Sequence, residues 1–178
     1  MSQAISEGDG ISLVAVVHSI EDAEAAEEAG AEAIVAATPL PGLRGATSLP
    51  ILVRAHLAAD AADADACVLT AADEVFHAEE RGVELVAEVR DEEELELVLE
   101  RFDPEILLLS SADADEDEDP LDHVLALLPD VPAGKLAIAD VPHTSREDVV
   151  ALERAGVDGV IVDAGHVAGL IGGDAPPV

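Results

Sequence analysis

Aromatic residues and cysteine are nearly absent from this sequence. Two of its 178 residues are phenylalanine, and there is no tryptophan or tyrosine. Because Phe76 and Phe102 fall within predicted helices, we expect no aromatic wall against which a flat ring could stack. Cys67 is the single cysteine and lies in an apolar run, which excludes a disulfide framework and a CxxC zinc site and indicates a reducing compartment.

Positive charge is also scarce. Eight lysines and arginines stand against 40 aspartates and glutamates, a net charge of −32, so the chain repels nucleic acid and anionic membranes. Yet 49% of the residues are hydrophobic, which disordered acidic chains lack. Self-repulsion of this size is tolerable where the Debye length falls to about 3 Å, near 1 M salt. We interpret the chain as a folded protein of a salt-rich cytoplasm, the alternative being an acidic interaction protein at ordinary salt.

Long hydrophobic runs are missing as well. No run reaches the ~18 apolar residues that a membrane span needs, and MSQAISEGDG at the start has neither a basic region nor an apolar stretch. We therefore expect a cytoplasmic protein that does not enter a membrane. The length is enough for one domain with a sizeable core. We expect a single domain over 1–178, with a polar lead at 1–10 and a tail at 173–178.

The most informative stretch is 135–168, which begins with a short apolar run. Thr144 and Glu147 have the spacing of a capping box, so a helix is predicted to start there. Apolar residues three or four apart follow, Gly156 ends the helix, and a second apolar run completes a strand–helix–strand unit. Such a unit pairs its two strands in parallel.

The same alternation recurs along the whole chain. Strands are predicted at 11–17, 32–37, 51–54, 66–69, 83–89, 105–109, 135–139 and 157–162, and helices at 20–29, 71–81, 92–102, 120–128 and about 165–171. Eight strands favour a closed (β/α)₈ TIM barrel, an α/β fold, over an open flavodoxin-like or Rossmann sheet. No GxGxxG follows the first strand, so a dinucleotide site has no support.

Two connections are too short for complete outer helices. Residues 38–49 contain two prolines and two glycines, and 56–62 leave room for only a couple of helical turns. We expect a compact barrel with shortened or missing helices after strands two and three. Because outward apolar side chains there need another cover, we expect a homodimer or a partner protein over residues 38–62.

Polar residues gather where the predicted strands end, which is the functional end of a TIM barrel. The residues expected to ring this mouth are His18, Arg54, His56, Glu88, Arg90, Asp140, His143, Asp163 and His166. Imidazoles and carboxylates together can move protons or hold a divalent metal. No HxH or HExxH spacing fixes two ligands together, so ordinary polar loops in an acidic protein are the alternative.

Five segments of the chain stand out: SLVAVV (12–17), EAGAEAIVA (28–36), PILVR (50–54), ELVAEVRDEEELELVLE (84–100) and SREDVVALERAGVDGVIV (145–162). Together they resemble the indole-3-glycerol-phosphate synthase family, the tryptophan-pathway member of the phosphate-binding barrels. The resemblance runs from about 12 to 169. It implies a TIM barrel with its site at the carboxyl ends of the strands, where Glu88 matches a family glutamate.

Other positions depart from that family. His18 replaces a lysine, Arg54 stands where the resemblance implies a general-acid lysine, and Asp140 replaces a glutamate. Three further differences are Val16 for a glutamate, Ser110 for an asparagine and Asp163 for a glycine beside the substrate phosphate. Arginine does not readily donate a proton, because its pKa exceeds about 12. The only lysine, Lys135, precedes a predicted strand and so belongs at the opposite end of the barrel.

We therefore expect a divergent barrel of this type that lacks the synthase activity and serves as a binding or assembly subunit for a small-molecule ligand or a partner. The alternative is an enzyme of altered acid/base or metal-assisted chemistry, acting on a small substrate that is not strongly anionic. A third hypothesis is the synthase reaction itself. The candidate site residues are Glu88, His18, Arg54, Asp140 and His143, and we expect no cofactor and no metal.

Overall fold

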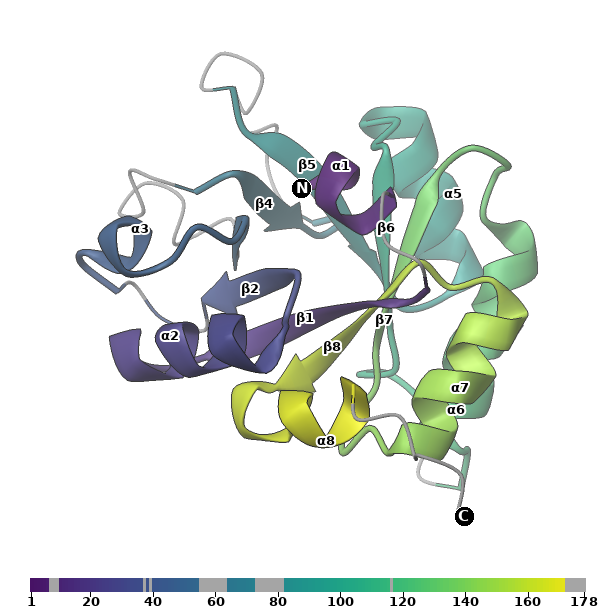
Figure 1. Ribbon diagram of the computed structural model, residues 1–178. Helices are drawn as coiled ribbons and strands as arrows, with labels where there is room; N and C mark the ends of the chain where they lie inside the picture. The colour runs from purple at the N-terminus through teal and green to yellow at the C-terminus, as the bar shows by residue number, and fades with distance from the viewer. Residues whose placement is uncertain are drawn as a thin grey trace, which may run out of the picture.

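The chain folds into a closed barrel of parallel strands. The computed structural model describes residues 1–6, 10–36, 38, 40–54, 64–72, 82–115 and 117–171. The strands are β1 (Ser12–Val17), β2 (Ala33–Ala36), β3 (Ile51–Arg54), β4 (Ala66–Leu69), β5 (Glu84–Val89), β6 (Ile106–Ser110), β7 (Leu136–Asp140) and β8 (Gly159–Asp163). Each strand pairs with the next in the sequence, and β8 pairs with β1 (Figure 1). The predicted TIM barrel is confirmed, and the open sheet was the wrong alternative.

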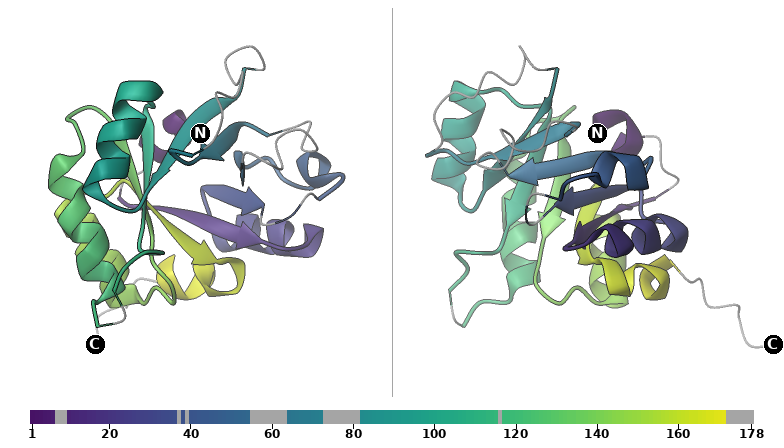
Figure 2. Two further views of the ribbon diagram at one scale, coloured as in Figure 1. Left: turned by 180° about the vertical axis from the view of Figure 1, so that it is seen from behind. Right: turned by 90° about the vertical axis from the view of Figure 1, so that its left-hand side faces the viewer.

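Helices cover the outside of the barrel. They are α2 (Ile20–Ala29), α3 (Leu43–Ala46), α5 (Glu92–Arg101), α6 (Pro120–Leu127), α7 (Arg146–Ala155) and α8 (Val167–Ile171), with 3₁₀ turns at Leu128–Asp130 and Ala164–His166. Figure 2 shows them on the outer side of the strands from two further directions. The helix predicted at 71–81 lies outside the described residues apart from its first two positions. No helix in the described parts of the chain has the length and apolar character to cross a membrane.

Alternation along the strands divides the apolar residues into two cores. One set points into the barrel, including Val14, Leu52, Val86, Leu108 and Ile138, all less than 2% exposed. The other set points outward and packs the strands against the helices. Because a strand of this barrel is buried on both faces, it reads in the sequence as a continuous apolar run.

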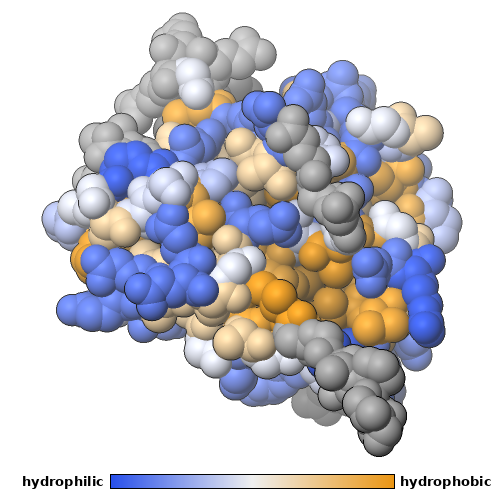
Figure 3. Space-filling model, in the orientation of Figure 1, coloured by the Kyte–Doolittle hydropathy of each residue, from blue (hydrophilic) through white to orange (hydrophobic). Residues whose placement is uncertain are grey.

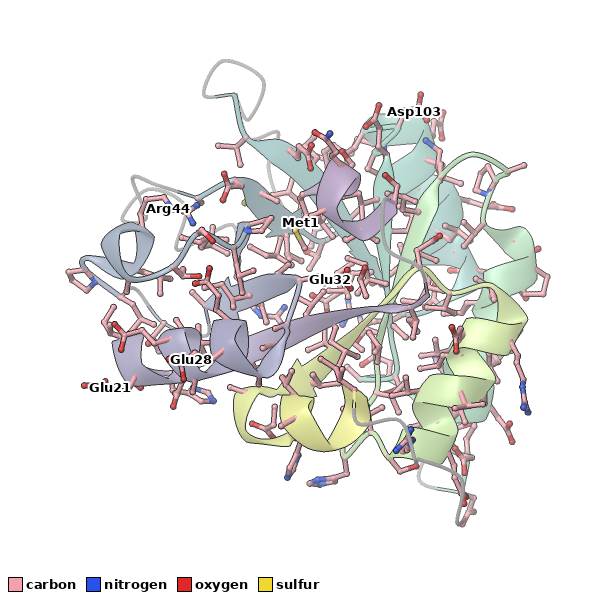
Figure 4. The ribbon with its side chains drawn as sticks, viewed as in Figure 1. Met1, Glu21, Glu28, Glu32, Arg44 and Asp103 are labelled. Carbon is pink, nitrogen blue, oxygen red and sulfur yellow. The ribbon has the colours of Figure 1, made fainter. Side chains whose placement is uncertain are left out.

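Residues 1–10 do more than lead into the first strand. They contain α1 (Ser2–Ser6), from which Met1 and Ile5 insert into the inner core with 9% and 2% exposure. The terminal amine of Met1 lies 2.9 Å from the Glu84 carboxylate, which also accepts hydrogen bonds from the backbone and hydroxyl of Ser2. Figure 4 shows Met1 between α1 and the strands. The helix α1 therefore closes the amino end of the barrel. The sequence indicates only a polar lead here and does not reveal this role.

Helix ends follow local sequence signals, with one shift. Ser19 caps α2 by accepting the Asp22 amide, and Gly30 ends that helix with φ of 95°. The capping box of α7 forms at Ser145 and Asp148, one residue after the predicted Thr144 and Glu147 pair. The sequence offers two overlapping capping-box spacings here, Thr144 with Glu147 and Ser145 with Asp148. The Thr144 hydroxyl instead donates to the Val141 carbonyl at 2.8 Å, so the prediction was wrong by one position.

In its described residues, the segment after β2 carries the four-residue helix α3 and no long helix, as the prolines and glycines predicted. Leu43 is buried, and Arg44 donates to the Asp65 carboxylate and to the carbonyls of Thr47 and Leu49. Figure 4 labels Arg44, which belongs to α3. This side chain thus fastens the short connection to the start of β4. Residues 55–63, which follow β3, lie outside the described residues.

Candidate functional site

The carboxyl ends of the strands bring polar side chains to the mouth of the barrel. Leu52, Val86 and Ile138 point into the barrel, so the residues two positions further along their strands point the same way. These residues are Arg54 on β3, Glu88 on β5 and Asp140 on β7. The same period of two that fills the barrel with apolar residues therefore places a cation and two carboxylates above it.

Arg54 and Glu88 form an ion pair. The Arg54 Nη1 atom lies 2.7 Å from the Glu88 Oε2 atom. The Glu88 side chain is 9% exposed and the Arg54 side chain is 44% exposed, so the carboxylate is nearly buried while the guanidinium reaches solvent. A pair of this kind holds both groups in place at the mouth.

Asp140 is the carboxyl most suited to proton transfer in this cluster. Burial raises the pKa of Asp140, the positive charge of Arg54 opposes that rise, and the negative charge of Glu88 adds to it. The net effect is a raised pKa for Asp140. A carboxyl group with a raised pKa is better suited to act as a general acid or base near neutral pH. Ser111, directly after β6, holds the end of β7 in place, because its amide and hydroxyl both donate to the Asp140 carbonyl.

A pocket of about 270 Å³ opens beside this cluster, over the ends of β7, β8 and β1. It is lined by Val16, His18, Asp140, Val141, Pro142, His143, Thr144, Ile161, Val162, Asp163 and His166. Five of the predicted mouth residues are therefore brought together here: three imidazoles and two carboxylates. The imidazoles and Asp163 are exposed, so the pocket is open to solvent.

The backbone holds two of these histidines in defined positions. His143 has φ of 56°, in the left-handed region that residues with a side chain seldom adopt. The amide of His18 donates to the Asp22 carboxylate at 2.9 Å, which holds the pKa of Asp22 below its usual range. His18 thus continues directly from β1 onto the capped start of α2, and His143 sits in the tight turn before α7.

One other predicted mouth residue, Arg90, is placed at the rim and not in the pocket. Arg90 pairs with Glu94 on α5 and, at 3.1 Å, with Asp113 in the connection after β6, so it joins two outer segments at the rim. His123 of α6 contacts the Arg90 carbonyl and the Glu118 carboxylate. His56 lies outside the described residues.

Lys135 lies at the opposite end of the barrel, directly before β7. Its Nζ atom lies 2.6 Å from the Asp103 carboxylate and 2.7 Å from the Pro104 carbonyl. Figure 4 labels Asp103 at the end of α5. The lysine ammonium therefore links the connection between α5 and β6 to the start of β7 and has no place at the mouth.

Metal binding has no preformed site in the part of the chain that the structure describes. Among those residues no group of three or more histidine, cysteine, aspartate or glutamate side chains converges as metal ligands would. The three imidazoles line one pocket without meeting at one point.

Sequence reasoning missed part of the pocket lining, which comes from the loop between β7 and α7. Val141, Pro142 and Thr144 line the pocket, whereas only Asp140 and His143 of this loop were predicted as site residues. Their position between a strand end and a capped helix was the available signal, since βα loops form the functional face of a TIM barrel.

No protein-family model matches the chain. Among curated proteins it is similar to indole-3-glycerol phosphate synthase of Geobacillus sp. (strain WCH70), with 26% identity over 171 residues. The match covers 82% of this chain and 66% of that relative, so the chain spans just under two thirds of the relative's length. The closed barrel and this similarity together identify a TIM barrel distantly related to indole-3-glycerol phosphate synthase.

Proposed function

We propose that the chain is a divergent barrel of the indole-3-glycerol-phosphate synthase type that binds a small ligand at its mouth and does not perform the synthase reaction. The Arg54–Glu88 ion pair carries this proposal. In this pair Arg54, which stands in place of the family's general-acid lysine, is bound to Glu88, which matches a family glutamate. Arginine does not readily donate a proton, and this one is held in an ion pair where a general-acid lysine would act.

The charge of the pocket defines the ligand class. Asp140 and Asp163 line it, and none of the described residues lining it is a lysine or an arginine. A phosphate group placed there would face Asp163 without a cation to balance it. At about 270 Å³ the pocket also lies just below the usual range for drug-sized ligands. The ligand we propose is therefore small and either neutral or cationic.

A second candidate is an enzyme of altered acid/base chemistry, and the raised pKa of Asp140 favours it. A carboxyl group that keeps its proton to higher pH, beside the exposed imidazoles of His18 and His143, can serve as a general acid while an imidazole serves as the base. In this version Arg54 and Glu88 orient the substrate and set the charge around Asp140.

The proposal also includes a salt-rich cytoplasm as the cellular setting and a partner over residues 38–62. The net charge of −32 supports a salt-rich cytoplasm. A partner over residues 38–62 stays a prediction, because much of that segment lies outside the described residues. The part that is described is held by Arg44 to its own chain.

A thermal-shift screen in molar KCl tests the binding proposal. We expect neutral or cationic small molecules to raise the melting temperature, and phosphate esters to leave it unchanged. Asp163→Asn should abolish the shift produced by a cationic ligand, while Asp122→Asn on the outer face of α6, with the same loss of charge, should preserve it. Stabilisation by phosphate esters, or equal loss in both variants, would contradict a pocket of this character.

A further inference from the structure

A group of charged side chains joins two βα connections at the rim of the mouth. Arg90 follows β5 directly, and its guanidinium pairs with Glu94 on α5 and, at 3.1 Å, with Asp113 after β6. His123 on α6 reaches the same place. Its Nε2 atom lies 2.8 Å from the Arg90 carbonyl oxygen, and its Nδ1 atom lies 3.0 Å from the Glu118 Oε2 atom. We call these five residues the rim cluster, and they tie the connection after β6 to the end of β5.

The two partners of the His123 ring can only accept hydrogen bonds. One is a carboxylate oxygen and the other is a backbone carbonyl oxygen. A neutral imidazole has one N–H donor and the imidazolium has two, so only the charged ring can donate to both oxygens. A neutral ring would leave one nitrogen lone pair facing an oxygen lone pair. The His123 side chain is 15% exposed, so water has little access to that contact, and the geometry selects the protonated ring.

The charges around the ring also favour its protonation. Burial lowers the pKa of His123, but its hydrogen bonds to the Arg90 carbonyl and the Glu118 carboxylate oppose that effect. The negative charges of Glu118 and Asp113 add to the opposition, so the pKa of His123 lies above its ordinary value of 6.5. The cation nearest the ring is Arg90, which Glu94 and Asp113 balance. The other charged groups on this side are acidic: Asp91, Glu92 and Glu93 line a hollow of about 610 Å³ with the ring, and Asp119 and Asp122 begin α6.

Positive charge is rare on this molecule, so one titrating cation has a large local effect. The net charge is −32, and hydrophilic residues cover surfaces such as that of α2, which holds five acidic residues and no basic one (Figure 3). The connection after β6 is more acidic still, with aspartate or glutamate at six of the seven positions from 113 to 119. A single charge gained or lost at His123 therefore changes how strongly this connection is held.

We propose that the rim cluster is a pH-sensitive latch, in which protonated His123 fastens the acidic connection after β6 to the end of β5 and neutral His123 releases it. Folding raises the pKa of His123, so the latch contributes its full stability below the ordinary value of 6.5 and loses it as the pH rises through the higher folded value. Above that pH the Glu118 carboxylate faces an uncharged ring among other carboxylates. Of the two ties, the Arg90–Asp113 pair then remains.

The latch lies beside the mouth, so its state alters one wall of the candidate site. Arg90 follows Glu88 by two residues, and Ser110 at the end of β6 pairs with Asp140. The next residue, Ser111, donates to the Asp140 carbonyl from the start of the same connection. Release of the connection therefore loosens the rim on both sides of these carboxylates. This holds whether the mouth binds a ligand or transforms it, so the latch does not depend on the proposed function.

Titration of the histidine rings tests the charge state. Two-dimensional ¹H–¹⁵N NMR of the full chain in molar KCl reports the protonation of each ring, and His123→Gln identifies the signals of His123 among the six histidines. We expect a midpoint above 6.5 for His123, and Glu118→Gln should lower it by about half a pH unit. Asp122→Asn is the matched control, because it removes the same charge from the neighbouring residue without touching the ring. A midpoint at or below 6.5, or equal effects of the two variants, would overturn the proposal.

Amide hydrogen exchange tests the release itself. The Glu118 amide donates to the Asp115 carbonyl at 2.9 Å within the connection. We expect its protection factor, corrected for the intrinsic pH dependence of exchange, to fall about fivefold between pH 6 and pH 8. In His123→Gln the protection should not change with pH, because glutamine does not titrate, and Asp122→Asn should keep the fall. Equal protection at both pH values in the natural sequence, or an equal fall in His123→Gln, would contradict a latch at this histidine.

Discussion

Replacing Arg54 with glutamine removes the cation on which two carboxylates at the mouth depend. Losing one partner of a fully buried ion pair costs about 3–5 kcal/mol, and an exposed pair is worth about 0–1 kcal/mol. The Glu88 side chain is 9% exposed and that of Arg54 is 44% exposed, so this pair lies between those limits. We expect Arg54→Gln to lower the free energy of unfolding by about 2 kcal/mol at neutral pH. For a chain of this length, that corresponds to about 5 °C in Tm.

The size of this loss should depend on pH. Burial raises the pKa of Asp140, and the charge of Arg54 opposes that rise, so the variant should raise the pKa of Asp140 further. A carboxyl group whose pKa is higher in the folded state costs stability once the pH exceeds its unfolded pKa, near 3.8. The deficit of Arg54→Gln relative to the natural sequence should therefore grow as the pH rises from about 4 to about 8 and shrink as it falls.

Urea unfolding at fixed KCl concentration measures this, followed by far-UV circular dichroism because the chain has no tryptophan or tyrosine. Arg101→Gln is the control, since Arg101 is exposed and donates to the Ala71 carbonyl; we expect a change within about 0.5 kcal/mol. The double variant Arg54→Gln/Glu88→Gln should recover part of the loss, because no buried charge is left without a partner. Equal losses for Arg54→Gln and Arg101→Gln, or a loss independent of pH, would refute the reasoning.

Three further predictions concern single side chains. Ile5→Ala should lower the free energy of unfolding by about 2–4 kcal/mol through the cavity it leaves; a urea midpoint that barely moves would show that α1 does not close the barrel. Asp140→Asn should raise Tm at pH 8 more than at pH 4, because it removes a carboxyl whose raised pKa costs stability on ionisation; calorimetry showing the opposite trend would reverse that sign. Ser145→Ala should cost about 1 kcal/mol in urea unfolding as the cap of α7, and a neutral result would return the cap to Thr144.

The fold was predictable because both kinds of element leave strong local patterns. A strand such as Ala66–Leu69, buried on both faces, appears in the sequence as a continuous apolar run. Gly30 and Gly156, which have left-handed backbone conformations, mark the ends of two helices. The helix α1 left no such pattern. Its contribution rests on two apolar residues, Met1 and Ile5, whose partners lie in distant strands.

The site was predictable as a set of residues and less so as a set of contacts. The period of two along each strand places Glu88 and Asp140 at the mouth, and this follows from the strand ends alone. That Arg54 pairs with Glu88, 34 residues away, depends on the stagger of the strands around the barrel, which a single sequence does not state. Arg90 is the opposite case, since its ion pair with Glu94 is local, four residues along the chain, and holds it at the rim.

The most direct test of the central proposal is turnover of 1-(2-carboxyphenylamino)-1-deoxyribulose phosphate, the substrate of the synthase reaction, followed by the fluorescence of the indole product in molar KCl. We predict that the natural sequence forms no more product than Glu88→Gln. Turnover by the natural sequence that Glu88→Gln abolishes would contradict the proposal and would show that Arg54 and Glu88 still support the family's chemistry.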